Sequence, residues 1–85
     1  MKRERRAFAP EKGVTYDNHG GGTFQCVGEA RRTNLWGWCA YFMNVKSGWK
    51  FEARGIHRYP DGRIDWDYSV MGRFVCKEAI HEEKV

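Results

Sequence analysis

Residues 49–54 and 64–70 each alternate between apolar and polar side chains, and this alternation constrains the fold more than any other feature of the sequence. A repeat of two residues is the period of a β-strand with one buried face, because successive side chains point to opposite sides. Between them lies Tyr59-Pro60-Asp61-Gly62-Arg63, which suits a type I turn followed by a glycine in the left-handed conformation. The three segments together predict a β-hairpin.

The turn also sets which residues of the two strands face each other. Counting back from it puts Ile56 opposite Trp66, but strict alternation then places Arg54 on the apolar face opposite Tyr68. A β-bulge at Gly55 removes this conflict, because one extra residue in a strand shifts the pairing by one position. We therefore predict that bulge and these cross-strand neighbours: Ala53 with Tyr68, Phe51 with Val70, His57 with Asp65 and Arg54 with Asp67.

Three further segments have the composition of strands, namely residues 14–17, 23–28 and 35–46. We therefore predict an all-β fold, or a β-rich α+β fold, built on an antiparallel meander of about five strands. The meander is either open or closed into a small barrel. Its predicted core consists of Phe24, Cys26, Tyr41, Met43, Trp49, Phe51, Trp66, Tyr68 and Val70.

The chain divides into three parts by composition. A polar, charged stretch broken by Pro10 predicts a basic arm over residues 1–13 that is either flexible or loosely docked. The β-domain is predicted over residues 14–74. Residues 75–85 are predicted to form either a short helix or a frayed tail, since their few apolar side chains fit one helix face among many charges.

A chain of 85 residues makes one domain, and it buries only about 60–65% of the surface that its unfolded form exposes. Four Trp, four Tyr and five Phe suit that limit, because each ring buries a large area. The odd, widely spaced cysteines Cys26, Cys39 and Cys76 favour reduced core residues, with one disulfide between two of them as the alternative. No apolar run reaches the length of a membrane span and no signal peptide is recognisable, so a cytoplasmic protein is expected.

His57, Asp65 and Asp67, on the polar face of the hairpin, have the side chains of a divalent-metal site or of an acid–base pair. Arg54 lies near enough to pair with these carboxylates, and exposed ion pairs across a sheet are ordinary, so we interpret the group as a solvated face. Spacing alone also allows a nucleophilic pair of Cys39 with His57, but Cys39 lies in the most apolar strand, where a thiolate is disfavoured. No enzymatic activity, metal site or cofactor is predicted.

Residues 35–46 are apolar on both alternating faces, which is typical of a strand that is covered on both sides or exposes rings to a partner. Aromatic rings flanked by arginines suit a protein interface. The candidate partner-binding residues, on one face of this strand and in the preceding turn, are Trp36, Trp38, Phe42, Arg31 and Arg32. The alternative is that most of these rings belong to the core.

The net charge of +4 is concentrated at the N-terminus, where Lys2, Arg3, Arg5, Arg6 and Lys12 outnumber Glu4 and Glu11. The rest of the chain is nearly neutral, so we expect a non-enzymatic binding module whose partner is a protein rather than a nucleic acid. The alternative is a small nucleic-acid binder that uses an aromatic face together with Lys2, Arg3, Arg5 and Arg6 as phosphate contacts. A third reading is a homodimer that buries Trp36 and Trp38 in its own interface.

The stretch Ser47-Gly48-Trp49, followed by Ala53, Gly55 and the run from Tyr59 to Ser69, resembles small uncharacterised proteins carried by bacterial phages and mobile elements. The resemblance is a pattern of aromatic residues and glycines that covers residues 47–70. It implies an accessory role in a bacterial cell, such as that of an inhibitor or adaptor, and it assigns no functional residue.

Overall fold

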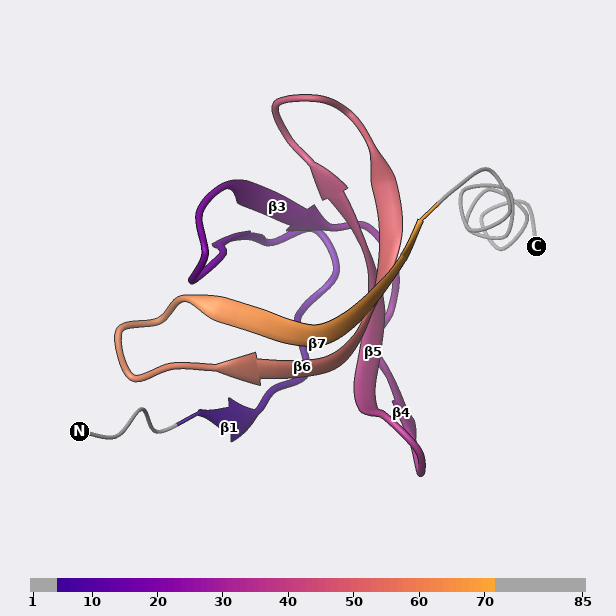
Figure 1. The fold of residues 1–85 in the computed structure, drawn as a ribbon. Coiled ribbons are helices and arrows are strands. Elements are labelled where there is room, and N and C mark those ends of the chain that lie inside the picture. The colour runs from indigo at the N-terminus through magenta and orange to yellow at the C-terminus, as the bar shows by residue number, and fades with distance from the viewer. Residues whose placement is uncertain (1–4, 72–85) are drawn as a thin grey trace.

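The computed structural model describes residues 5–71, which form one antiparallel sheet of seven strands (Figure 1). The strands are β1 (Arg6–Ala7), β2 (Thr15–Asp17), β3 (Thr23–Cys26), β4 (Arg31–Thr33), β5 (Gly37–Asn44), β6 (Lys50–Arg58) and β7 (Ile64–Met71). The predicted all-β class is confirmed for these residues, none of which is helical. The predicted C-terminal helix or tail, Cys76, and the candidate phosphate contacts Lys2 and Arg3 lie outside the described residues.

The predicted meander corresponds to β2, β3, β5, β6 and β7, while β1 and β4 are short strands added to it. β5 and β6 are the long central strands; β3 and β4 pair with successive parts of β5, and β7 pairs with β6. The sheet curls strongly (Figure 1) but does not close, because its two ends meet only at an isolated bridge between Asn18 and Ile64. The structure therefore has the open form of the predicted meander.

The N-terminal arm is docked on the sheet from Arg5 onward. Arg6 and Ala7 pair with the end of β6, and the amide of Phe8 donates a hydrogen bond of 3.0 Å to the carbonyl of Ile56. The Phe8 ring packs edge-on against Tyr16, with 5.5 Å between ring centroids. From Arg5 onward the arm is thus docked, because its single large apolar side chain covers the edge of the core.

The core consists of Cys26, Ala40, Phe42, Phe51, Ala53, Ile56 and Ile64, with Trp66 and Phe24 packed against it. β5 therefore directs Ala40 and Phe42 into this core, whereas Tyr41 packs with Val70 in a smaller cluster on the opposite face. Two predicted core residues are wrong, because Trp49 is 60% exposed and Tyr68 is 49% exposed.

The predicted bulge at Gly55 is wrong, since β6 and β7 keep one register along their whole length. Ile56 lies opposite Trp66 and His57 opposite Asp65, as predicted. The remaining predicted neighbours are replaced by three pairs: Arg54 with Tyr68, Ala53 with Ser69 and Phe51 with Met71.

β6 and β7 keep their register because the side chains of both strands switch to the opposite face of the sheet at the same point. Ala53 and Ile56 both lie in the core, although an odd spacing would place them on opposite faces of a regular strand. In β7, Trp66 packs on the core, whereas Val70 packs on the other face despite an even spacing. Gly55 lies at this change of face and has φ 75°, a left-handed conformation that glycine adopts without steric cost.

Gly55→Ala is expected to destabilise the fold more than Gly48→Ala, although both glycines have positive φ. A Cβ at Gly55 would lie 2.7 Å from Asp67 Oδ2 and 3.1 Å from Asp67 Cβ, whereas a Cβ at Gly48 meets nothing within 4 Å. We expect a loss in the free energy of unfolding of about 2–4 kcal/mol for Gly55→Ala and about 1 kcal/mol for Gly48→Ala, measured by urea denaturation. Equal losses would contradict the crowding at Asp67.

Candidate functional site

The predicted aromatic contact residues do not form one surface. Phe42 is fully buried in the core. Trp38 packs against the core, with the guanidinium carbon of Arg32 5.8 Å from its ring centroid. Trp36 instead stacks on Tyr68, with 5.3 Å between centroids and 14° between planes. The other four predicted contact residues keep part of their surface exposed, but Trp36 and Trp38 contact different parts of the molecule.

Arg31 belongs to an ion-pair cluster around the buried carboxylate of Glu52, and 41% of its own side chain stays exposed. It bonds to the carboxylate of Glu52, which is only 5% exposed, and its guanidinium lies 5.5 Å from the Tyr41 ring centroid. Arg54 donates two hydrogen bonds, of 2.8 and 3.0 Å, to the same carboxylate. These hydrogen bonds raise the pKa of Arg54 above its ordinary value. The two arginines satisfy a carboxylate that would be costly to bury alone.

The polar face of the hairpin is a set of ion pairs and hydrogen bonds. Asp67 lies 3.4 Å from Arg5 and 3.9 Å from His57 Nδ1, while Arg54 binds Glu52 and not the predicted Asp67. His57 Nδ1 is buried and has no hydrogen-bond partner among residues 5–71. Within that range no group of three His, Cys, Asp or Glu side chains is arranged to hold a metal ion.

Both described cysteines are free and buried, as predicted for reduced core residues. Burial raises the pKa of the Cys26 thiol, which disfavours the nucleophilic thiolate. Cys39 Sγ lies 3.8 Å from the carbonyl of Gly37 and 3.9 Å from Thr33 Oγ1. These surroundings are those of a packed side chain.

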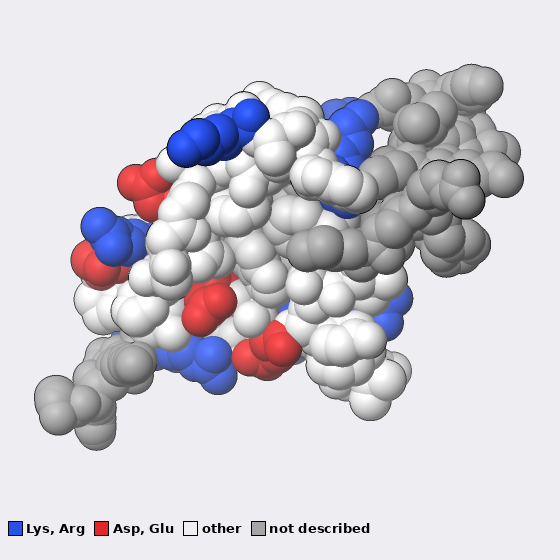
Figure 2. All heavy atoms as spheres, turned by 45° about the horizontal axis from the view of Figure 1, so that its top comes forward, with Lys and Arg blue, Asp and Glu red and all other residues white. Residues whose placement is uncertain are grey.

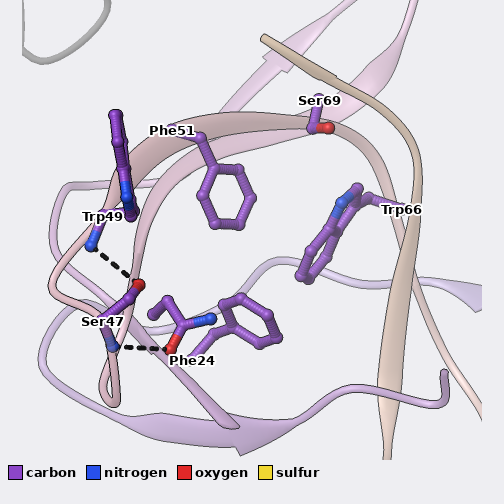
Figure 3. A pocket seen from close by; sticks show the side chains of 7 residues that line it. Phe24, Ser47, Trp49, Phe51, Trp66 and Ser69 are labelled. Atoms are coloured by element: carbon purple, nitrogen blue, oxygen red, sulfur yellow. Dashed lines mark hydrogen bonds between the residues drawn. The ribbon is translucent and has the colours of Figure 1, made fainter. Parts of the chain in front are cut away.

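A pocket of ≈ 490 Å³ opens beside the β5–β6 turn (Figure 3). It is lined by Phe24, Asn44, Ser47, Trp49, Phe51, Trp66 and Ser69. Phe24, Phe51 and Trp66 are in mutual contact, with centroid separations of 5.3 to 5.6 Å, and they form the base. Trp49 forms an exposed wall, so the pocket offers aromatic surface from strands β3, β6 and β7 and from the turn.

Local hydrogen bonds hold the turn that carries this wall. Asn44 Oδ1 accepts hydrogen bonds from the amides of Lys46 and Ser47, at 2.9 and 3.1 Å. Ser47 Oγ accepts one from the amide of Trp49 at 3.2 Å, as the dashed lines of Figure 3 show. Gly48 has φ 82°, and its amide donates to the Asn44 carbonyl at 2.7 Å. The backbone of Trp49 is therefore positioned before any ligand binds, which lowers the entropic cost of binding.

Among residues 5–71, the lining of the pocket includes no ionisable side chain, and its polar groups are the Asn44 amide, two serine hydroxyls and the indole N–H groups. Volume and lining are those of sites that enclose an apolar group and orient it with a few hydrogen bonds. Alternation in the sequence does not reveal the site, because it assigns Phe24, Trp49, Phe51 and Trp66 to the core. The one available signal was Trp49, which directly follows the Ser47-Gly48 turn.

Charges around the molecule are mixed rather than gathered in a basic patch. Figure 2 shows cationic and anionic side chains interspersed over one face. Several arginines are paired with carboxylates: Arg5 with Asp67, Arg31 and Arg54 with Glu52, and Arg63 with Asp61. Arg6 is exposed in β1. Of the phosphate contacts predicted for the arm, the structure describes two. Arg5 is paired with Asp67, and Arg6 is exposed.

Comparison with known proteins adds no relative, since no protein-family model, curated protein or solved structure matches the chain. Among residues 5–71 there is no helix of the length and apolarity that crossing a membrane requires. The case for the pocket therefore rests on its geometry.

Glu52→Gln is expected to lower the free energy of unfolding by about 1–3 kcal/mol, because it weakens the hydrogen bonds of a buried carboxylate to two arginines. Asp61→Asn is the matched control, since Asp61 and Arg63 are both exposed and 4.0 Å apart. We expect the control to change stability by less than about 0.5 kcal/mol in urea denaturation at neutral pH. A Glu52→Gln loss no larger than that of the control would contradict the role given to the cluster.

Proposed function

We propose that this protein is a non-enzymatic binding module that receives an apolar side chain of a protein partner in the pocket beside the β5–β6 turn. One observation carries the proposal: Trp49 is 60% exposed at the mouth of an aromatic pocket, in a chain too small to leave large apolar rings in water without cost. Exposed aromatic rings beside a preformed hollow are typical of interface hot spots. The proposed contact surface thus moves from Trp36, Trp38 and Phe42 to the pocket.

The absence of charge in the lining favours a protein partner over a nucleic acid. Phosphate binding needs several unpaired cations along a groove, and the paired arginines described above are less available for it. The pocket lining offers apolar area and a few neutral hydrogen-bonding groups, which suit the side chain of a large apolar residue. An accessory or inhibitor protein of a mobile element, as the sequence resemblance implies, would use such a surface.

A small nucleic-acid binder is the second candidate, on one specific observation. Lys46 and Lys50 flank Trp49 in the chain, and a nucleobase could stack in the pocket while lysines contact its phosphate. The two candidates differ in salt dependence, because phosphate contacts release counterions and apolar contacts do not.

We expect p-cresol, a mimic of the tyrosine side chain, to bind in the pocket with millimolar affinity, the range for so small a ligand. In ¹⁵N NMR spectra the indole N–H signals of Trp49 and Trp66 should shift and saturate, while those of Trp36 and Trp38 should not. Trp49→Ala should weaken binding about tenfold. Trp36→Ala, which removes an indole outside the pocket, should leave the affinity for p-cresol unchanged.

The same spectra with a thymidine octanucleotide, at low and high salt, decide between the candidates. Tight binding of the octanucleotide that salt abolishes, with shifts at Lys46 and Trp49, would assign the pocket to nucleic acid. Absence of saturable shifts at Trp49 and Trp66 with p-cresol would contradict the pocket itself.

A further inference from the structure

We infer that the partner binds as an extended peptide that pairs with the outer edge of β7 and places one apolar side chain in the pocket. This inference rests on the proposed function and specifies the form of its partner. It combines two features of the structure that lie side by side: an open sheet edge and the aromatic pocket.

The outer edge of β7 is open along most of its length. β7 pairs with β6 on one side from Ile64 to Met71. On its other side, the described residues provide only the bridge to Asn18 and a hydrogen bond of 2.8 Å from the amide of His19 to the carbonyl of Ile64. Beyond Ile64 the sheet has no further strand among residues 5–71. An edge of this kind is a template for an added strand.

The register identifies which backbone groups of β7 face outward. The amide of Tyr59 donates to the carbonyl of Arg63, so this pair is hydrogen-bonded across the hairpin. In an antiparallel ladder hydrogen-bonded and non-hydrogen-bonded pairs alternate, which directs the backbone groups of Ile64 and Trp66 outward. The amide of Asn44 donates to the carbonyl of Trp49, and counting along β6 from there turns the backbone groups of Arg54 toward its partner in β7. Beyond the change of face at Gly55, the outward backbone groups are therefore those of Ser69. The bond from His19 to the Ile64 carbonyl agrees with this assignment. The amide of Trp66 also agrees, because it donates a hydrogen bond of 2.8 Å to the side chain of Asp65.

The pocket lies along the same edge. Trp66 and Ser69 of β7 line one side, and Phe24 of β3 lies across the opening with its ring centroid 5.3 Å from that of Trp66. A strand added to β7 would run about 4.8 Å from it, and alternate side chains of that strand would point to the same face as the side chain of Ser69. One of them would therefore enter the pocket, which is the arrangement of peptides bound by strand addition.

The distribution of charge along the edge indicates the chemistry of the peptide. Asp65 and Asp67 place carboxylates at the end of β7 near the hairpin turn, whereas residues 68–70 carry no charge and no proline. Charged residues and prolines usually protect an edge strand from pairing with another chain. Residues 68–70 have neither, so the unprotected part of the edge lies next to the pocket. Lys46 is exposed in the adjoining turn and forms no ion pair with a carboxylate of the described residues. The peptide should therefore combine a large apolar residue with an acidic residue near it.

The test begins with selection from a library of random dodecapeptides displayed on phage, using the full chain as the target. We expect enrichment of sequences that hold an aromatic or large aliphatic residue close to Asp or Glu. A selected peptide is then synthesised unmodified and with a single N-methyl group at each position in turn. N-methylation removes one backbone donor, so strand pairing should make affinity fall about tenfold or more at alternate positions only.

Three protein variants complete the design. Trp49→Ala should weaken binding of the peptide about tenfold or more, while Trp36→Ala should leave the affinity unchanged. Lys46→Glu should weaken it about three- to tenfold, and replacing the acidic residue of the peptide by lysine should restore affinity to that variant. If the lysine peptide does not regain affinity for Lys46→Glu, the inferred pairing of Lys46 with an acidic residue of the peptide is overturned.

The remaining outcomes separate the inference from the proposed function. Binding that requires Trp49 but tolerates N-methylation at every position would leave the pocket function standing and overturn the strand addition. Selected peptides that bind the Trp49→Ala variant as tightly as the unchanged protein would overturn both the strand addition and the pocket function. A library that yields no binding peptide would overturn both as well. A doubling of mass in sedimentation that Trp49→Ala abolishes would assign the edge to a second copy of this chain instead.

Discussion

The curl of the sheet depends on aromatic rings that meet across its opening. In the part of the chain that the structure describes, backbone groups join the two ends of the meander only near Ile64, so side chains must hold the rest of the opening. Trp66 of β7 meets Phe24 of β3 edge to face and Phe42 of β5 nearly face to face, each with 5.3 Å between centroids. Aromatic pairs of this geometry contribute about 0.5–1.5 kcal/mol each beyond the area they bury. Two of these rings, Phe24 and Trp66, also line the pocket, so fold and candidate site share one set of contacts.

This sharing divides the pocket residues into two kinds. Phe51 is buried and Trp66 packs on the core, so their loss would weaken the fold as well as the pocket. Trp49 is mostly exposed and is held through the backbone of its turn. Its side chain therefore adds little to the core, and its position is explained more readily by contact with a ligand. For this reason Trp49 separates binding from stability more cleanly than any other residue of the lining.

Alternation in the sequence was sufficient to predict the five strands of the meander, the hairpin turn and the pairing of Ile56 with Trp66. It missed the short strands β1 and β4, the second of which lies in the segment predicted as a turn. It failed at Gly55, because a conflict in one strand can be resolved by a shift of register or by a matching change of face in its neighbour, and only the tertiary structure selects between them. Alternation also could not decide which of the two apolar faces of β5 enters the core. Phe42 was consequently assigned to a surface, and the Trp49 of the pocket to the core.

An open edge and an unfilled aromatic pocket in so small a domain have a common physical origin. Had β2 and β7 paired along their length, the sheet would have closed into a barrel and the backbone groups of β7 would be satisfied. In the described residues they meet instead at the bridge between Asn18 and Ile64, and the contact between Phe24 of β3 and Trp66 of β7 spans the rest of the opening without backbone pairing. A bound strand would supply both missing contributions at once, the hydrogen bonds of the edge and the burial of Trp49. The partner would then complete the barrel, so affinity and stability of this domain should rise together on binding.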